Sequence, residues 1–578
     1  MLKLFKKYLT PYWQGILITL FLLFLQALAN LFLPFLMSQI IDRGVIHGDM
    51  PYIFYTGLFM LFMALLGGLF VVIANFFSSR VAMHFSRDIR EHLFVKVESF
   101  NLEEFNAIGT ASLITRTTND VTQVQQVVLM ALRMMVTAPL MIIGGLIMAV
   151  STNAQLSVIL LVSLPLLVLV IFLISRKALP LFTSMQKKID RINLIVRENL
   201  TGVRVVRAFN KVDFEQERFN VANLDLTNTS IDVNKIIAVL IPSMMFLMNL
   251  TSVFILWFGS DIVDQGVLEV GSLIAFVQYV MQIMMSLIML SMMFVLIPRA
   301  AASGERINEV LETAFSIEDT TTEVRRTQLH GEVEFKDVSF FYPGSEEAAL
   351  SHISFKASPG RTTAIIGGTG SGKSTLTSLV TRFYDATAGE ILVNGHNVKD
   401  FTQEQLRAYI GLVPQKAILF SGSIRDNLKY GKEDATDEAI WSALETAQSR
   451  DFVSQKEGQL DAFIAQGGTN VSGGQRQRLS IARALVREPQ IYIFDDSFSA
   501  LDFKTDKALR EALKPKTKDA ATILVAQRIS TIMDADEILV LVDGHLVGKG
   551  THKELLETCP DYLEIALSQL SKEEIENV

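Results

Sequence analysis

Cysteine and positive charge are what this 578-residue sequence has little of. Its one cysteine, Cys559, excludes an intramolecular disulfide framework and a zinc site built from cysteines, so we expect an inert thiol. The 52 Lys and Arg are outnumbered by 60 Asp and Glu, which gives a net charge of −8. Because a general nucleic-acid binder needs a basic excess to neutralise phosphates, we expect no nucleic-acid partner.

Charged residues of either sign are also scarce, at 19% of the chain, while 50% of the residues are hydrophobic. The mean hydropathy of +0.35 is too high for an ordinary soluble protein and indicates membrane-spanning segments. A chain of 578 residues also exceeds what one hydrophobic core organises, so we expect about three structural units.

Long apolar runs are confined to the first 300 residues, and each is close to the ~20 residues that cross a bilayer as a helix. After residue 330, short β-rich runs alternate with helical patterns and glycine turns, which is typical of a soluble α/β domain. We therefore predict a multidomain chain: an all-α transmembrane domain of six helices over residues 1–312, a linker over 313–330 and an α/β domain over 331–578. The six runs cover residues 15–37, 54–77, 128–151, 156–175, 236–258 and 271–297.

Basic residues are unevenly divided between the segments that join these runs. Segment 176–235 carries eleven Lys or Arg and segment 79–127 carries five, whereas segment 259–270 carries none. Basic segments stay on the cytoplasmic side, so we expect a multi-pass protein of the cell membrane with both basic segments and both termini in the cytoplasm. The helical pattern of the basic segments predicts that the spanning helices continue well beyond the bilayer.

Polar residues inside the apolar runs are few, and intramembrane polar groups are functional candidates by default. Hydrogen bonding between helices is the alternative role for the amides, and Arg133 lies near enough to the end of its run to extend toward the membrane surface. The last run is rich in methionine, which suits either helix packing or contact with varied apolar molecules. The polar residues are Gln26, Asn30, Arg133, Asn249, Gln278 and Gln282.

The stretch Gly367–Thr375, GGTGSGKST, fits the phosphate-binding pattern G-x-x-x-x-G-K-[ST]. It follows a strand-like run, Thr362–Gly367, and precedes a helical run, Thr375–Phe383, which is the context that the motif requires. Small residues let backbone N–H groups close around phosphates, Lys373 reaches the β- and γ-phosphates, and the Ser374 hydroxyl ligates Mg²⁺. A second apolar run ends in Asp495, a strand-end acid suited to the same Mg²⁺. These features predict that the α/β domain binds ATP with Mg²⁺.

A second glycine-rich element, NVSGGQRQRLSIARAL, lies about 100 residues after the first. Ser472 is placed to cap the following helix and to leave the N–H groups of Gly473 and Gly474 exposed toward an anion. One nucleotide does not need two γ-phosphate cradles, so we expect this element to serve a nucleotide held by another copy of the domain.

Together these motifs resemble those of the ABC transporter superfamily, specifically a half-transporter of the multidrug exporter type, and the resemblance covers the chain from the six-span region to the C-terminus. It implies that residues 331–578 form a P-loop NTPase of the ABC ATPase kind. It also implies that Phe209–Phe219 and the stretch near Asn101–Gly109 couple the membrane helices to nucleotide domains.

The resemblance also assigns roles to single residues. VSFFYP matches the A-loop, so Tyr342 would stack on adenine, and LVPQ matches the Q-loop, so Gln415 would contact Mg²⁺ or its water. SGGQ matches the signature and SALD the D-loop. The implied nucleotide-binding residues are Tyr342, Gly367, Thr369, Gly370, Ser371, Gly372, Lys373, Ser374, Thr375, Gln415, Ser472, Gly473, Gly474, Gln475 and Asp502, and the implied metal ligands are Ser374, Gln415 and Asp495.

The chain departs from the family pattern at the residues that act on the γ-phosphate. Asp496 stands where family members that hydrolyse ATP well have Glu, which withdraws the carboxylate by roughly 1.5 Å. Gln527 stands at the switch-histidine position and cannot carry a proton. A milder departure places Gln466 and Gly467 where many exporters have Glu-Arg. Because a misplacement of ~1 Å costs on the order of 10²-fold in rate, we expect Asp496, Gln527 and Gln415 to be the catalytic residues, with Asp496 and Gln527 both degenerate.

These departures, with an intact signature, predict the degenerate-site half of a heterodimeric ATP-driven exporter of hydrophobic or amphipathic compounds. Its own site would bind ATP and hydrolyse it slowly, while its signature would complete the site of a second half-transporter chain. The alternatives are a homodimeric multidrug or lipid exporter with two slow sites, and an ATP-gated channel or regulatory receptor.

Overall fold

The computed structural model describes residues 1–320 and 331–570, so residues 321–330 of the predicted linker and residues 571–578 lie outside the described part. The contacts divide the chain into two compact units. The first holds Met1–Glu98 and Thr110–Thr313, and the second holds Ser99–Gly109 and Ala314–Val578. The predicted domain of residues 1–312 includes Ser99–Gly109, which by its contacts belongs to the second unit.

The first unit is built from long, apolar helices. Within the described residues, six helical segments are long and apolar enough to cross a membrane, and each contains one of the predicted runs. They are 43 to 53 residues long. At a rise of ~1.5 Å per residue, each exceeds twice the ~30 Å hydrocarbon core, which agrees with helices that continue beyond the bilayer. The segments are Lys3–Val45, Met50–Glu98, Thr110–Thr152, Ala154–Thr201, Val212–Asp264 and Val270–Glu312.

Short elements interrupt or join these segments at their ends. The helical elements of the first unit are α1 (Leu2–Leu9), η1 (Thr10–Tyr12), α2 (Trp13–Gln39), η2 (Ile40–Val45), α3 (Met50–Glu98), α5 (Thr110–Thr115), η3 (Arg116–Asp120), α6 (Val121–Thr152), α7 (Ala154–Thr201), α8 (Val203–Ala208), α9 (Val212–Asp264) and α10 (Val270–Glu312).

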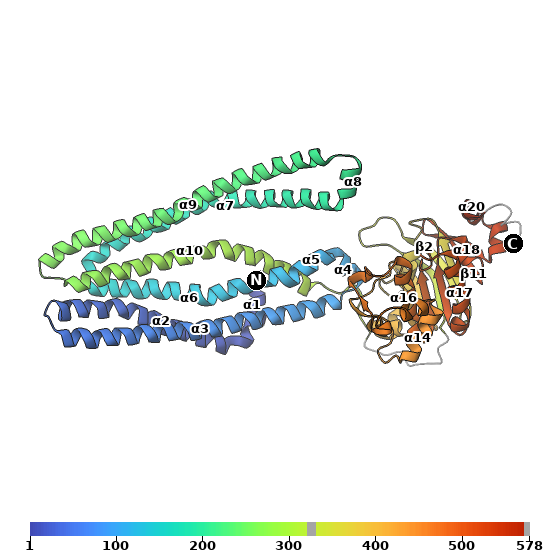
Figure 1. Cartoon of the computed structure of the whole chain (residues 1–578), viewed down its shortest axis with the longest axis horizontal. Helices are drawn as coiled ribbons and strands as arrows, with labels where there is room; N and C mark the ends of the chain where they lie inside the picture. Colours follow the sequence, from blue (N-terminus) through green and yellow to red (C-terminus); the bar gives the residue numbers. More distant parts are fainter. Residues whose placement is uncertain (321–330, 571–578) are drawn as a thin grey trace. The chain divides into compact units, whose positions relative to one another are not determined.

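Pairs of antiparallel helices build the first unit. Helix α2 packs on α3, α6 on α10 and α7 on α9. Buried side chains of α2, α6, α7, α9 and α10 share one hydrophobic cluster, with Phe276 and Ile283 of α10 fully buried in it. Toward α8, the pair α7 and α9 diverges from the other four long helices (Figure 1). The tip of this pair therefore lacks cover from the rest of its own unit.

Polar side chains in the apolar runs hydrogen-bond to neighbouring helices. The Arg133 guanidinium on α6 donates to the hydroxyls of Ser78 (2.9 Å) and Ser79 (2.7 Å) and to the Asn75 carbonyl (3.1 Å), all on α3. The Gln282 amide donates to the Asn30 carbonyl at 3.4 Å. Both side chains therefore form hydrogen bonds between helices. Because α3 provides acceptors for Arg133, its guanidinium does not need to extend to the membrane surface.

The second unit is an α/β domain around a mixed sheet. The described strands form a ten-stranded sheet in the order β5-β4-β1-β2-β12-β11-β3-β10-β9-β6, and β7 pairs with β8. Strands β11, β3, β10, β9 and β6 are parallel neighbours, whereas β1, β2, β4 and β5 pair in antiparallel fashion. The strands are β1 (Val333–Phe340), β2 (Leu350–Ala357), β3 (Thr362–Gly367), β4 (Ala388–Val393), β5 (His396–Asn397), β6 (Ile410–Val413), β7 (Gly422–Ser423), β8 (Phe463–Ile464), β9 (Ile491–Asp495), β10 (Ala521–Val525), β11 (Glu537–Val542) and β12 (His545–Gly550).

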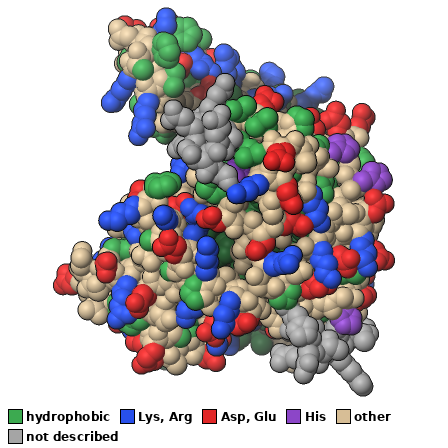
Figure 2. All heavy atoms as spheres, turned by 90° about the vertical axis from the view of Figure 1, so that its right-hand side faces the viewer, with side chains coloured by type: hydrophobic (Ala, Val, Ile, Leu, Met, Phe, Trp, Pro, Cys, Tyr) green, Lys and Arg blue, Asp and Glu red, His purple; other side chains and the backbone are tan. Residues whose placement is uncertain are grey.

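Helices cover the sheet and enclose two hydrophobic clusters. On the face seen in Figure 2, Lys and Arg are interspersed with Asp and Glu over this unit, so opposite charges neutralise each other locally. The helical elements are α4 (Leu102–Ile108), α11 (Lys373–Val380), η4 (Val398–Asp400), α12 (Gln403–Ala408), α13 (Ile424–Lys429), α14 (Asp437–Thr446), α15 (Arg450–Ser454), η5 (Gln459–Asp461), η6 (Gln466–Gly468), α16 (Gly473–Val486), α17 (Phe503–Thr517), α18 (Ile529–Ile532), α19 (His552–Thr558) and α20 (Pro560–Gln569).

The helix after the phosphate-binding loop differs from its predicted bounds of Thr375–Phe383. Helix α11 begins at Lys373 and ends at Val380. It ends early because Arg382 adopts a positive φ of 51° and is buried, where its guanidinium donates to the Phe401 carbonyl at 2.9 Å. The apolar pattern did not reveal this, since Arg382 and Phe383 continue a helical spacing.

Candidate functional site

The predicted site residues converge because four parallel strands end at the same edge of the sheet. Strands β3, β6, β9 and β10 are parallel and run β6-β9-β10-β3. The chain leaves their carboxyl ends at Gly367, Val413, Asp495 and Val525. Ligands of open α/β sheets bind at this edge, so residues that are distant in sequence meet there.

One cavity of about 330 Å³ holds most of the predicted nucleotide residues, and we call it the Walker cavity. Gly367, at the end of β3, contributes its carbonyl to the loop behind the cavity. Ser472, Gly473, Gly474, Gln475 and Asp502 are not among its described lining residues. The lining residues are Tyr342, Ala349, Thr369, Gly370, Ser371, Gly372, Lys373, Ser374, Thr375, Gln415, Asp495, Asp496, Val525 and Gln527.

The phosphate-binding loop wraps around the end of Lys373. Its Nζ donates to the carbonyls of Gly367 (2.9 Å) and Gly368 (2.6 Å). Burial lowers the pKa of Lys373, and the nearby Asp496 and Asp495 oppose that shift. Gly372 is required at the start of α11, because its φ is 95° and a Cβ there would lie 2.7 Å from the Ala349 carbonyl oxygen. The loop thus places a cation and the N-terminus of α11 at one end of the cavity.

Asp495 lies behind the loop, among hydroxyl groups. The Ser374 hydroxyl lies 3.4 Å from its Oδ1 and the Thr377 hydroxyl 3.5 Å from its Oδ2, as weak hydrogen bonds. Burial, with a further contribution from Asp496, raises the pKa of Asp495 above its usual value, and these hydroxyls oppose the rise. The donors offered by Ser374, Asp495 and Gln415 are all oxygen atoms, which suits Mg²⁺. Among the described residues no three His, Cys, Asp or Glu cluster together, so phosphate oxygens and waters would complete such a site.

Asp496 is held by two amides. Both Gln415 Nε2 (3.2 Å) and Gln527 Nε2 (3.0 Å) donate to the same carboxylate oxygen, Oδ2. The Gln527 backbone carbonyl accepts in turn from Gln569 of α20 at 2.8 Å. Asp496 also has a positive φ of 46°, a conformation that Asp adopts more readily than most residues. The structure therefore brings Asp496 and Gln527, the two residues that depart from the family pattern, into direct contact with each other, and Asp496 also contacts Gln415.

Tyr342 lines the same cavity and lies beside the start of α11. Its hydroxyl hydrogen-bonds to the Thr375 hydroxyl at 2.9 Å, and its ring meets that of Tyr384 edge to face at 5.4 Å. The Tyr384 hydroxyl accepts from the Asn106 amide of α4 at 3.2 Å. Sequence reasoning missed Tyr384, which belongs to no recognisable motif, and it assigned the stretch that contains Asn106 to coupling and not to the nucleotide site. It also missed Thr377, whose spacing of four residues from Lys373 on α11 is the one available clue.

The signature residues form a separate surface, which we define as Ser472, Gly473, Gly474 and Gln475 at the start of α16 and call the signature surface. Ser472 Oγ accepts from the Gln475 backbone N–H at 3.2 Å, and Gln475 Oε1 accepts from the Ser472 N–H at 3.0 Å. The predicted cap is confirmed. Asp502 likewise caps α17 by accepting from the Thr505 N–H at 2.9 Å, and these hydrogen bonds lower the pKa of Asp502.

Comparison with known proteins agrees with this geometry. Residues 16–287 match the ABC transporter transmembrane region and residues 350–499 match the ABC transporter family. An ABC transporter ATP-binding protein of Mycobacterium tuberculosis is 43% identical over 98% of each chain. The chain belongs to the ABC transporter family.

More distant relatives specify the kind of ABC transporter. An ATP-dependent lipid A-core flippase of Mannheimia succiniciproducens is 31% identical over 97% of this chain and 96% of its own. A solved structure of a bacterial Atm1-family ABC exporter with ATP bound is 25% identical, with a TM-score of 0.81 over 98% of this chain and 99% of that one. The chain is thus an ABC exporter half-transporter and a multi-pass membrane protein. Its ABC ATPase domain binds ATP and couples hydrolysis to transport, and exporters of this kind act as dimers.

Proposed function

We propose that this ABC exporter chain is the degenerate-site half of a heterodimer. Its Walker cavity binds ATP with Mg²⁺ through Tyr342, the phosphate-binding loop and Asp495, and hydrolyses it slowly. Its signature surface completes the active site of a second half-transporter chain, which supplies its own phosphate-binding loop and strand-end Asp, with a catalytic Glu and a switch His. ATP binding at both sites closes the two nucleotide domains, and hydrolysis mainly in the partner's site reopens them.

The hydrogen bonds around Asp496 carry this proposal. A water that attacks the γ-phosphate needs an acceptor within about 2.6–3.2 Å, and fast turnover also needs a group near that phosphate which carries a proton or positive charge. Here the short Asp496 side chain has one oxygen occupied by the amides of Gln415 and Gln527. Neither amide takes up a proton, so the cavity retains its binding groups but lacks an efficient proton acceptor.

Exposed apolar residues at the tip of the α7–α9 pair support a partner chain. Phe209 is 71% exposed and Leu200 is 73% exposed, and the same tip carries Arg204 and Arg207. Basic residues place this tip in the cytoplasm rather than in lipid. Apolar side chains there gain free energy when a partner covers them, as expected for the coupling segment Phe209–Phe219.

The membrane helices also support a proposed orientation and a proposed substrate class. We propose cytoplasmic termini, because the basic segments 79–127 and 176–235 lie on the same side as both ends of the chain. Met281, Met285 and Met289 recur every four residues on α10 and are 38%, 48% and 46% exposed. A flexible, polarizable face of this kind suits varied hydrophobic or amphipathic compounds, and the flippase relative supports a lipid among them.

The decisive experiment restores the two γ-phosphate groups. The double variant Asp496→Glu with Gln527→His, reconstituted with the native partner, should raise hydrolysis in this chain's own cavity by on the order of 10²-fold. Turnover in that cavity is isolated by inactivating the partner's Walker site, and Lys373→Ala on top of the double variant is the control that abolishes the gain. Unchanged turnover in the double variant overturns the degenerate-site proposal.

The heterodimer is tested separately. Purification of the tagged chain from its native membrane should yield a second ABC chain in equal amount. If the chain instead purifies only with itself and the homodimer hydrolyses ATP rapidly, the alternative with two equivalent sites replaces this proposal. Uphill movement of a dye by the reconstituted complex distinguishes an exporter from a channel.

A further inference from the structure

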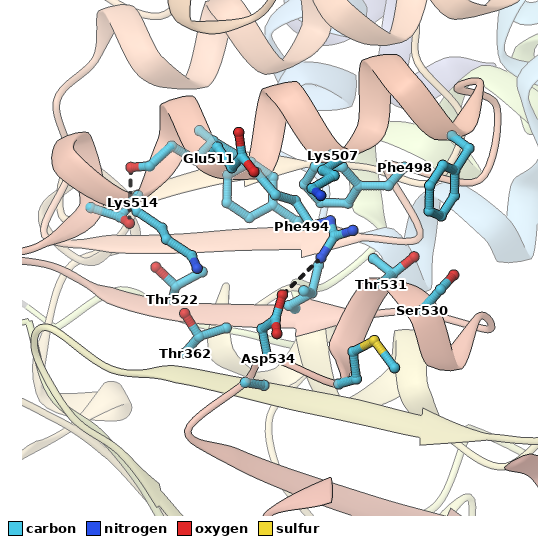
Figure 3. Close-up of a pocket in the computed structure, with 17 residues that line it drawn as sticks. Thr362, Phe494, Phe498, Lys507, Glu511, Lys514, Thr522, Ser530, Thr531 and Asp534 are labelled. Carbon is cyan, nitrogen blue, oxygen red and sulfur yellow. Dashed lines mark hydrogen bonds and ion pairs between the residues drawn. The ribbon is translucent and has the colours of Figure 1, made fainter. Parts of the chain in front are cut away.

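A second cavity, of about 280 Å³, lies inside the ATPase domain and shares no lining residue with the Walker cavity. One wall is α17, the floor is formed by Thr362, Phe494, Thr522 and Leu524 on neighbouring strands β3, β9 and β10, and the residues from Ser530 to Ala535 close one side (Figure 3). We call it the α17 cavity.

The interior of the α17 cavity is apolar and aromatic. Phe494, Phe498, Leu513 and Leu524 line it and are only 1%, 4%, 6% and 6% exposed. The rings of Phe494 and Phe498 lie 5.5 Å apart, inclined at 53° to each other. A flat aromatic molecule in contact with these groups gains burial free energy and ring–ring contacts.

Along α17 the cavity is lined by three basic side chains and by the carboxylate of Glu511, which lies one turn from both lysines. Lys507, Arg510 and Lys514 follow one another at spacings of three and four residues, which places them on one side of the helix. Arg510 is balanced by two carboxylates, Asp506 at 3.4 Å and Asp534 at 3.6 Å. Lys507 and Lys514 have no hydrogen bond or ion pair to any residue in the described part of the chain, and in Figure 3 Lys514 points toward Thr522. Two unpaired ammonium groups thus border an apolar interior.

We propose that the α17 cavity binds an amphipathic aromatic anion, a fused two-ring system bearing one carboxylate, sulfonate or phosphate group. The ring system occupies the space over Phe494 and Leu524, and the anionic group meets Lys507 or Lys514 at the rim. The size agrees, because a 150 Å³ apolar cavity holds one benzene and this cavity has nearly twice that volume. Opposite-charge pairing at the rim fixes the orientation of the ligand, as the few polar groups of small-molecule sites do.

The elements that form this cavity continue into the nucleotide chemistry. Phe494 directly precedes Asp495, Phe503 directly follows Asp502, and Ser530 lies three residues after Gln527. A ligand that joins α17 to the segment after Gln527 contacts all three elements at once. The α17 cavity is therefore a regulatory site, whose ligand shifts ATP turnover to the extent that it binds the open and closed nucleotide domains unequally.

The test measures binding of naphthalene-2-sulfonate to the full chain with its partner in lipid nanodiscs, by calorimetry, with uncharged naphthalene-2-sulfonamide as the matched probe. The sulfonate should bind, and the double variant Lys507→Gln with Lys514→Gln should weaken it about tenfold, as expected for loss of charge pairing at a partly buried rim. The matched control, Lys504→Gln with Lys518→Gln, removes the same charge from α17 and the residue that follows it, outside the cavity lining, and should change the affinity less than about twofold.

A second variant tests the cavity itself. Ser530→Trp places a large ring in the opening from a partly exposed position and should abolish binding, while unaltered ATP binding reports an intact fold. The proposal is overturned if the sulfonate fails to bind at about 1 mM. It is equally overturned if the sulfonamide binds as well as the sulfonate, or if all variants bind alike. None of these readouts depends on how fast the Walker cavity hydrolyses ATP.

Discussion

The Walker cavity and the signature surface belong to the same unit, and each offers a helix N-terminus to a phosphate. At the signature surface, Ser472 and Gln475 satisfy each other in a complete capping box. In the Walker cavity, Asp495 and Ser374 retain the oxygen donors for Mg²⁺, but Asp496 has the amides of Gln415 and Gln527 on one oxygen. On the proposed function, the signature surface would supply its full set of contacts to a nucleotide, whereas the Walker cavity would bind ATP without an efficient proton acceptor.

In the proposed heterodimer, this difference would divide the work of one chain between two nucleotides. Both places have groups that can bind a phosphate, whereas only the Walker cavity has Asp and Gln at the two positions proposed to govern hydrolysis. Substitutions on the signature surface should therefore affect the turnover of the whole complex far more than substitutions at Asp496 do.

The largest effect is expected from Gly473→Asp. A carboxylate at the start of α16 neutralises the positive potential of the helix N-terminus and repels the γ-phosphate of the nucleotide bound to the partner, so ATP hydrolysis by the complex should fall on the order of 10²-fold. A Cβ at Gly473 meets no atom within 4 Å, so folding is spared. Gly473→Ala is the control and should have a smaller effect. Unchanged hydrolysis in Gly473→Asp would remove the signature surface from the active site.

A tenfold effect on ATP affinity is expected from removing the Tyr342 ring in the Walker cavity. Tyr342→Ala removes the ring and should weaken ATP binding to this chain about tenfold, within the range of aromatic stacking on a base. Tyr342→Phe keeps the ring but loses the hydrogen bond to Thr375, and should cost only about twofold. Phe341→Ala, an exposed aromatic neighbour, is the matched control in a fluorescent-nucleotide binding assay. Equal affinity in all three variants would mean that adenine does not contact Tyr342.

Acidification should weaken Mg²⁺ binding to this cavity. Asp495 binds the cation in its ionised form, and burial raises its pKa, so protons compete with Mg²⁺ at a higher pH than at an exposed Asp. Below the raised pKa, the Mg²⁺ affinity should fall by up to about tenfold for each pH unit. Titration of Mg²⁺-dependent nucleotide binding from pH 7.5 downward measures this. In Asp495→Asn both the affinity and its pH dependence should be lost, and a persisting pH dependence would assign the effect to another group.

The smallest effect is expected from Asp496→Asn. The degenerate-site proposal assigns Asp496 little of the turnover, so hydrolysis by the complex should change less than about twofold. The amide oxygen of Asn still accepts from Gln415 and Gln527, which preserves the local geometry. A drop of tenfold or more in steady-state hydrolysis would show that Asp496 is an efficient catalytic group. The proposed difference between the Walker cavity and the signature surface would then be wrong.

Much of the fold and of the candidate site was readable in the sequence. The apolar runs predicted six long helices, and the loop around Lys373 predicted the strand and helix that flank it, because these signals depend on neighbouring residues. The end of α11 was predicted wrongly, since Arg382 breaks the helix to reach the Phe401 carbonyl in a distant segment. Tyr384 and Asn106 were not assigned to the nucleotide site for the same reason. These two residues join the site through contacts between segments that are far apart in the sequence.

The sequence by itself determined which chemical groups are present: an Asp at position 496, a Gln at position 527 and an intact signature. Only the tertiary structure decided that both amides bind one oxygen of Asp496, because Gln415 and Gln527 are 81 and 31 residues away from it along the chain. The order of the parallel strands brings these three side chains to one edge of the sheet. That strand order results from long-range packing, and the local pattern of residues does not predict it.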